Sequence, residues 1–328
     1  ICKYKSKFNE EGENVKFLRI EDEVIYSKKR YKLKREIDKL FLDEEYFQIE
    51  PQLFEEYDEF TTINNKIPEE SMVKVVNGKV MVLRADITTS IIKSLVPRWE
   101  DGLKLKLFYN SSIYKNKNTV GIKEIRQIGC EYLGEASVEA DREVVKLALK
   151  ILEKYNNNFI LEVGSSKYIH GLLEELNLNK NCENQIKNLL YTKNTHELKV
   201  YIEELKIKRE VKELLSNILS LQGNLYNVIE KSNKFYCNNK MKQALEELKQ
   251  VNNLIEECNF LDKARFDLSM ITMLDYYEGI MFRGYYPNSY KEILSGGRYD
   301  SLTKEYGKKI PAIGFTLSVD ELMKYVYK

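Results

Sequence analysis

The sequence predicts an α+β protein in which helices flank a mostly antiparallel β-sheet and a helical segment interrupts that sheet. Three patterns support this fold class. Short runs with alternating apolar residues are joined by turn signals, of which Asn77-Gly78 is the strongest for a hairpin. Residues 137–155 have a pronounced helical periodicity. Residues 172–258 contain no proline and only one glycine, which is typical of consecutive amphipathic helices.

The first half of the chain alternates between predicted helices and strands. Leu33, Ile37 and Phe41 share one stripe within residues 24–46, together with Leu40, which predicts a helix. Pro51 indicates a strand end or edge within the extended segment 47–60. The elements expected next, in order, are a hairpin at 71–86, a helix at 88–96 that begins at a threonine cap, strands at 103–115 and 122–134, a helix at 137–155 and a strand at 156–166.

The second half is predicted to carry a helical insertion. Its expected bounds are residues 172–260, which divide the core into a first part, 1–171, and a second part, 261–328. Periodicity leaves two roles open for the insertion, a partner contact or a lid. The elements expected after it are strands at 264–270, 276–286, 290–297 and 311–318, with helices that begin at Tyr299 and Val319.

Composition narrows the class of protein. The chain has 328 residues, 43% of them hydrophobic and 31% charged, with a formal net charge of +1. Such a balance creates no overall field that attracts nucleic acid or lipid, and no apolar run has the roughly 20 residues that span a bilayer. The first ten residues are too polar for a signal peptide, and five cysteines without a C-x-x-C pair indicate reduced thiols in the cytoplasm. With only His170 and His196, no histidine-rich metal site is expected, and a catalytic triad or Cys-His pair is disfavoured. We therefore expect neither a metal nor a cofactor.

One polar segment joins a predicted strand to a helix at Leu83 to Ser90. It carries Arg84, Asp86 and Thr88. A carboxylate at Asp86 can hold the ammonium of a ligand, because it accepts charged N–H bonds. The competing interpretation is that Asp86 caps the helix that follows.

Two further segments have both a ligand-binding and a structural interpretation. Gln127, Gly129 and Glu131 fall on one sheet face, where they either meet a polar ligand or face solvent. In "GGRYDSL", Arg298 either pairs with a ligand carboxylate or phosphate or forms a structural salt bridge beside a tight turn. The lysine-rich stretch 31–39 is interpreted as a solvated helix face, and a tRNA contact there is the alternative.

The order of these motifs resembles the histidyl-tRNA synthetase catalytic domain. The segments that carry the resemblance, from about residue 24 to the end, are Leu83-Arg84-x-Asp86-x-Thr88, Gln127-x-Gly129-x-Glu131, Ala140-Asp141-x-Glu143, Leu274-Asp275-Tyr276-Tyr277, Gly296-Gly297-Arg298-Tyr299-Asp300 and Pro311-Ala312-Ile313-Gly314-Phe315. The resemblance implies a class II synthetase-like fold with its own helical insertion. It also implies a motif 1, formed by the first helix and "QIEPQLFE", through which the chain forms a homodimer.

The resemblance also implies a histidine pocket. Asp86, Thr88, Gln127 and Glu131 would surround the ammonium and carboxylate of histidine. Tyr276 or Tyr277 would contact the imidazole, with one tyrosine facing the ligand from a strand and the other packing behind it. The residues expected to support this pocket are Arg84 and Arg298.

Three departures from the synthetases are expected to abolish aminoacylation. The synthetases carry Arg-Gly before Leu-Asp-Tyr-Tyr, whereas this chain has Thr272-Met273. Lys115 falls at the motif 2 arginine, and Glu321 falls at the arginine of motif 3. A glutamate there repels phosphate, since two like charges 4 Å apart cost roughly 1 to 4 kcal/mol at intermediate dielectric. Adenylate formation depends on such cations in the transition state.

The chain also ends soon after motif 3, so no anticodon-binding domain is expected. This truncated, catalytically depleted form resembles the regulatory subunits of ATP phosphoribosyltransferase, the first enzyme of histidine biosynthesis. The resemblance implies a hetero-octamer with the short-form catalytic subunit, which the chain activates allosterically and helps to inhibit when histidine accumulates. The alternatives are a truncated synthetase-like amino-acid ligase and a pseudo-synthetase that senses an amino acid or binds tRNA.

Overall fold

A single large β-sheet organises the part of the chain that the structure describes. The computed structural model describes residues 7–8, 14–15, 19–63, 67–117, 121–272 and 276–326. Within these residues the sheet has nine strands in the order β10-β11-β9-β12-β13-β14-β8-β7-β3, and all neighbours are antiparallel except β11 with β9 and β3 with β7. The predicted α+β class with a mostly antiparallel sheet is therefore confirmed. The strands of this sheet are β3 (Phe47–Gln48), β7 (Leu105–Lys117), β8 (Gly121–Leu133), β9 (Ile160–Ser165), β10 (Gln222–Gly223), β11 (Ala264–Asp267), β12 (Ile280–Tyr285), β13 (Leu294–Arg298) and β14 (Ala312–Ser318).

In the described part of the chain, two smaller sheets accompany the large one. The first pairs β1 (Lys7–Phe8) with β2 (Asn14–Val15). The second has the order β4-β6-β5, with bounds β4 (Phe54–Glu56), β5 (Lys74–Asn77) and β6 (Lys79–Leu83). Gly78, at a φ of 74°, turns β5 into β6, so the predicted Asn-Gly hairpin is confirmed.

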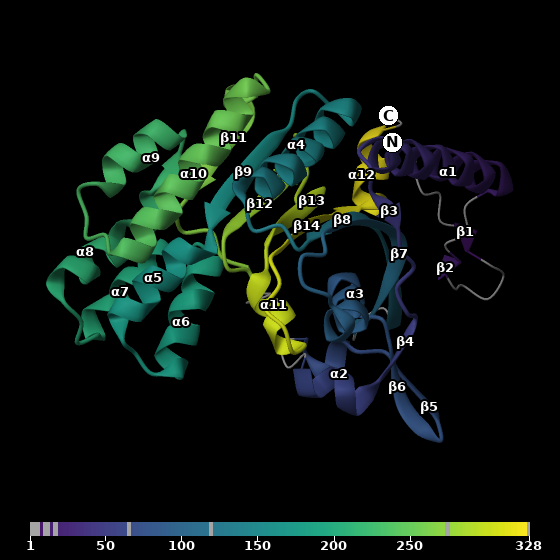
Figure 1. Ribbon diagram of the computed structural model, residues 1–328, viewed down its shortest axis with the longest axis horizontal. Helices are drawn as coiled ribbons and strands as arrows, with labels where there is room; N and C mark the ends of the chain where they lie inside the picture. The colour runs from purple at the N-terminus through teal and green to yellow at the C-terminus, as the bar shows by residue number, and fades with distance from the viewer. Residues whose placement is uncertain are drawn as a thin grey trace.

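The two faces of the large sheet bury different cores. One face, which we call the back face, is covered by α1 (Ile20–Asp43), α4 (Val138–Tyr155) and α12 (Val319–Val326), which lie above the sheet in Figure 1. Phe108, Cys130 and Phe315 belong to the main apolar core there. On the front face, Tyr109 belongs to a second core with α3 (Ile87–Leu95) and α11 (Asp300–Glu305). Because side chains alternate along each strand, the neighbours Phe108 and Tyr109 belong to different cores.

A series of helices connects β9 to β11 along the chain and is coloured from teal to green in Figure 1. Asparagines at four of their starts accept a hydrogen bond from the backbone N–H three residues later, at 2.9 to 3.2 Å. Such caps satisfy N–H groups that have no partner in the first helical turn. The capping residues are Asn179, Asn194, Asn224 and Asn238, and the helices of the segment are α5 (Ser166–Leu176), α6 (Lys180–Tyr191), α7 (Thr195–Glu204), α8 (Arg209–Asn217), α9 (Leu225–Ser232) and α10 (Asn239–Glu257).

Three local predictions are wrong. The segment 47–60 is not extended throughout, because α2 (Tyr57–Ile63) follows β4 directly. The helix α3 begins at Ile87 and is capped by Asp86, not by a threonine. The strand expected at 276–286 begins only at Ile280, so Tyr276 and Tyr277 lie in the preceding loop. A run of apolar and aromatic residues fits a buried loop as well as a strand, which explains the last error.

Candidate functional site

The candidate site is the front face of the sheet around β8. Gln127, Gly129 and Glu131 are paired with alternate residues of β14, so they share one face, as their spacing predicts. Glu131 lies opposite Gly314, and Gly129 lies opposite Thr316. The front face of the sheet therefore carries a strip of polar and glycine positions along β8 and β14.

Glycines on this face leave room for larger side chains from the neighbouring strand or loop. A Cβ at Gly314 would clash with the carboxylate of Glu131, and one at Gly129 would clash with the hydroxyl of Tyr109. A Cβ at Gly297 would lie 2.8 Å from the Tyr277 ring. Any larger residue at these positions would displace the polar and aromatic groups of the site.

Glu131 is the buried centre of the site, with 1% of its surface exposed. The Thr88 hydroxyl donates to one carboxylate oxygen at 2.7 Å, and the Tyr299 hydroxyl donates to the other. Burial raises the pKa of Glu131 to about 8, the two hydrogen bonds oppose this rise, and the charge of Asp86 adds to it. The Glu131 carboxyl therefore keeps its proton at pH values where an ordinary glutamate is ionised.

Asp86 fulfils the structural role that the sequence left open. Its carboxylate accepts a hydrogen bond of 2.7 Å from the backbone N–H of Thr89 and so caps α3. This cap uses one oxygen, and the charge of Asp86 still acts on Glu131. The α3 cap thus brings Asp86 and Thr88 to Glu131, which lies more than 40 residues later in the chain.

Aromatic rings line the other side of Glu131. The rings of Tyr276 and Tyr277 lie 4.9 Å apart at an angle of 48°, and Tyr276 meets Tyr299 edge-on at 6.1 Å. The two tyrosines do not lie on opposite faces of a strand, because both belong to the loop before β12. Tyr276 is nonetheless buried in the front core, and Tyr277 packs against it.

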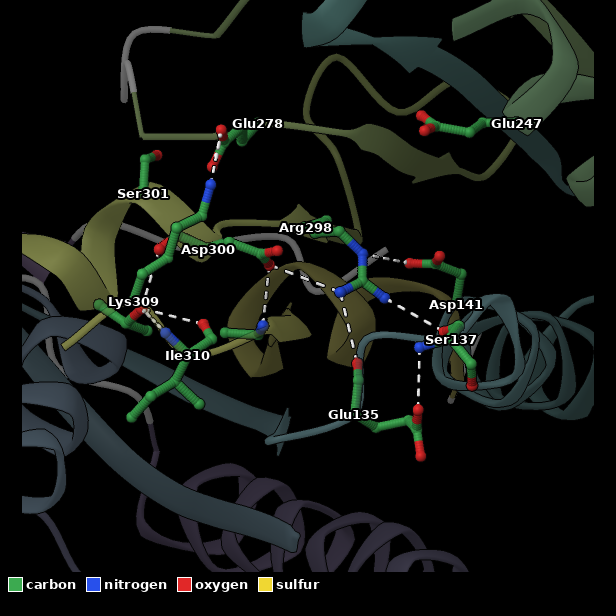
Figure 2. A network of polar contacts seen from close by, with 12 residues as sticks. Glu135, Ser137, Asp141, Glu247, Glu278, Arg298, Asp300, Ser301, Lys309 and Ile310 are labelled. Atoms are coloured by element: carbon green, nitrogen blue, oxygen red, sulfur yellow. Dashed lines mark hydrogen bonds and ion pairs between the residues drawn. The ribbon is translucent and has the colours of Figure 1, made fainter. Parts of the chain in front are cut away.

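The two arginines that were expected to support the pocket lie elsewhere. Arg84 is buried and donates to the backbone carbonyls of Pro51 at 2.6 Å, Gln52 at 3.1 Å and Ser112 at 2.9 Å. It joins the loop before β4 to β7. Arg298 lies on the back face and donates to Asp141 of α4, which corresponds to the structural salt bridge that the sequence left open (Figure 2).

The three positions that depart from the synthetases are spread over separate elements. Lys115 is near the end of β7 opposite Lys123, so two like charges face each other. Thr272 precedes the tyrosine loop, whereas Met273, Leu274 and Asp275 fall outside the described residues. Glu321 of α12 is paired with Lys324 at 2.5 Å and with Lys291 at 3.8 Å, so its charge is compensated locally.

Sequence reasoning missed two contributors to the site. Tyr299 was noted only as part of a glycine-rich motif, although its hydroxyl contacts Glu131 directly. Tyr109 was not singled out, although it lies opposite Gly129 on the adjacent strand. A large aromatic residue paired with a glycine across two strands is the signal that could have found Tyr109.

The described residues show neither a cluster of three His, Cys, Asp or Glu side chains that could hold a metal ion nor a helix able to cross a membrane. The groups that the front face does present are a buried carboxylate, hydroxyl groups and aromatic rings.

Comparisons with known proteins agree with this architecture. The profile of the histidyl-tRNA synthetase family matches residues 25–322. An ATP phosphoribosyltransferase regulatory subunit from Clostridium kluyveri is 32% identical over 305 residues, which cover 90% of this chain and 78% of that protein. One from Oceanobacillus iheyensis is 31% identical and matches 89% of this chain and 73% of its own length.

Solved structures show the same fold. A crystal structure from Bacillus halodurans C, described as an ATP phosphoribosyltransferase regulatory subunit/histidyl-tRNA synthetase, has a TM-score of 0.83 and 26% identity, over 92% of this chain and 80% of that one. A chain of an ATP phosphoribosyl transferase complex from Thermotoga maritima has a TM-score of 0.67 and 16% identity, over 88% of this chain and 97% of that one. At this identity the second likeness concerns the fold alone.

Proposed function

This chain belongs to the family of ATP phosphoribosyltransferase regulatory subunits, which share the histidyl-tRNA synthetase fold, and from that membership we propose a function as a non-catalytic subunit. It activates a short-form ATP phosphoribosyltransferase catalytic subunit and contributes to feedback control by histidine. The observation that carries this proposal is the polar front-face cluster around Glu131 together with altered residues at the positions for adenylate chemistry.

The altered positions support a role without aminoacylation. Glu321 stands where the synthetases place an ATP-binding arginine, and its two lysine partners compensate its charge without reversing it. Thr272 has no positive charge to offer to a carboxylate or phosphate. Only Lys115 keeps a cation, and it lies opposite Lys123 at the end of a strand pair. These three positions therefore offer fewer cations to stabilise a phosphoryl or acyl-adenylate transition state than the arginines of the synthetases do.

Histidine is the ligand that we propose for the front face. Its ammonium and carboxylate lie among Asp86, Thr88, Gln127 and Glu131, and its imidazole packs against Tyr276 or Tyr277. Burial keeps a proton on Glu131 up to about pH 8. Because an ammonium beside Glu131 favours the ionised carboxylate, binding of histidine is expected to release this proton. Histidine then changes the partner's activity through the difference between its affinities for the active and inhibited assemblies.

A homodimer formed through the first helix and β3 is part of the proposal. Leu42, Phe47 and Leu53 are exposed by 57%, 70% and 41%, and β3 is an outer strand of the large sheet. Apolar side chains beside a free sheet edge are suited to burial by a second copy. We expect Phe47→Glu to shift sedimentation from dimer to monomer, whereas Tyr226→Glu, which alters an exposed tyrosine on α9, leaves the dimer intact.

Reconstitution with the short-form catalytic subunit tests the main proposal. The catalytic subunit alone is expected to be nearly inactive, and addition of this chain is expected to restore ATP phosphoribosyltransferase turnover in a hetero-octamer. Equal turnover with and without this chain contradicts the regulatory role. Exchange of pyrophosphate into ATP in the presence of histidine distinguishes the non-catalytic subunit from the ligase alternative. Measurable exchange would support the ligase, because it requires intact adenylate chemistry.

Titration calorimetry tests the histidine site separately. We expect histidine to release heat on binding to the chain or to its complex, and Asp86→Asn with Glu131→Gln to abolish that heat. If histidine binds neither to the chain alone nor to its complex, the histidine site is contradicted, whereas the activating role is not.

The helical segment 172–260 is proposed as a distinct subdomain of the synthetase-like core, whose two other parts are 1–171 and 261–328.

A further inference from the structure

Arg298 and Tyr299 are consecutive residues that act on opposite faces of the sheet. The Tyr299 hydroxyl donates to Glu131 on the front face, whereas the Arg298 guanidinium donates to Asp141 of α4 on the back face. Side chains alternate at the end of β13 as they do along any strand. A shift of the backbone at Arg298 therefore also moves the hydroxyl that contacts Glu131.

Arg298 is fixed mainly by contacts to the segment that follows β8, the strand of Glu131. Its Nε donates to the Asp141 carboxylate at 3.0 Å, and its two terminal nitrogens reach the carbonyls of Glu135 at 3.4 Å and Ser137 at 3.5 Å. Figure 2 shows the guanidinium at the centre of these contacts. The end of β13 is thus tied to the loop that begins a few residues after Glu131.

Asp300 anchors the other side of Tyr299. Its carboxylate accepts a hydrogen bond of 2.9 Å from the Ala312 backbone N–H and one of 3.5 Å from Arg298. The Tyr299 N–H donates to the Ala312 carbonyl at 2.8 Å. Ala312 begins β14, which lies between β13 and β8 in the sheet. The residues on either side of Tyr299, Arg298 and Asp300, are therefore both anchored to other elements.

The buried setting makes this arrangement stiff. The side chains of Arg298 and Asp141 are exposed by only 13% and 12%. In such surroundings a charge pair with additional hydrogen bonds keeps one geometry, because a charge left without its partner is costly. Burial raises the pKa of Asp141, and the nearby Arg298 guanidinium opposes this rise.

We propose that Arg298 is a positioning residue for the front-face site: through Asp141, Asp300 and the loop after β8, it holds the Tyr299 hydroxyl on Glu131. The network also connects α4 on the back face to the site on the front face. The consequence for histidine rests on the proposed function, but the effect on the proton of Glu131 does not depend on any ligand.

A double-mutant cycle on the pKa of Glu131 tests this proposal. For each variant, the pKa follows from the pH dependence of the unfolding free energy with and without Glu131→Gln. Tyr299→Phe removes a bond to the ionised carboxylate, so we expect the pKa to rise by about one pH unit. Arg298→Gln is expected to produce most of the same rise in the Glu131 pKa. The combination of Arg298→Gln with Tyr299→Phe is expected to raise this pKa little further.

Controls distinguish positioning from a general loss of structure. Arg298→Lys, which keeps the charge, is expected to restore part of the original pKa of Glu131. Lys309→Met removes a nearby ion pair, 3.1 Å from Glu278, that does not contact Tyr299, and it should leave that pKa unchanged. If Arg298→Gln does not fold, Asp141→Asn is measured in the same cycle, because it weakens the same anchor.

Two results would overturn the proposal. The first is an unchanged Glu131 pKa in a folded Arg298→Gln or Asp141→Asn variant. The second is a full additional rise when either change is combined with Tyr299→Phe, since Arg298 would then act independently of the tyrosine. Histidine titrations with the same variants are a separate readout: absent binding in the wild type rejects the histidine site, whereas the pKa cycle still decides the role of Arg298.

Discussion

Replacement of Glu131 by glutamine is predicted to change how the stability of the protein depends on pH. Glutamine has nearly the shape of the protonated acid, but it does not titrate. In the native protein, burial raises the pKa of Glu131 from its ordinary value of 4.5 to about 8. The unfolded chain has no such burial, so the two states bind different numbers of protons between these pH values.

The sign and size follow from this difference. Between about pH 4.5 and 8 the native state keeps a proton on Glu131 that the unfolded chain has released, so the unfolding free energy falls as pH rises. At about 1.4 kcal/mol for each unit of pKa, the upper bound of the loss is about 5 kcal/mol. The contribution of Glu131 is fully favourable below pH 4.5 and is lost as the pH approaches 8.

Urea unfolding between pH 5 and 8.5 measures this effect. The difference between wild type and Glu131→Gln should change steadily with pH, and the variant should gain relative stability at the alkaline end. The exposed Glu230→Gln serves as a matched control and should give a difference that is nearly constant with pH. Parallel pH profiles for wild type and Glu131→Gln would refute the assignment of a buried, protonated Glu131.

Three further changes have predicted outcomes. Gly314→Ala places a Cβ against the Glu131 carboxylate and the Cys130 carbonyl, so we expect a loss of roughly 1–3 kcal/mol or more in urea unfolding; wild-type stability would contradict the packing. Asn224→Ala should lower stability by about 1 kcal/mol through loss of the α9 cap, and Asn238→Ala should lower it more, because that side chain also donates to the Gly171 carbonyl at 2.9 Å; thermal melts that rank them in reverse would contradict this reasoning. Lys193→Met removes a 2.5 Å ion pair with buried Asp267, so hydrogen exchange should become faster in the turn between α6 and α7; unchanged exchange would show that the pair does not hold this turn.

Local patterns in the sequence predicted elements best where the geometry of a single turn or strand decides the structure. The Asn77-Gly78 turn forms because glycine adopts a positive φ, and the alternation of Gln127, Gly129 and Glu131 follows from the geometry of any strand. The same logic failed at Tyr276 and Tyr277. Their aromatic character indicates burial, which a packed loop provides as well as a strand does.

The sequence by itself determined the α+β class, the strand that carries Glu131 and the replacement of cationic residues at Thr272 and Glu321. Only the tertiary structure decided that Thr88 and Tyr299 meet at the Glu131 carboxylate and that Arg298 lies on the other face. The physical reason is distance along the chain. These partners are 43 and 168 residues from Glu131, so their contact is set by strand order and register, which no local pattern encodes.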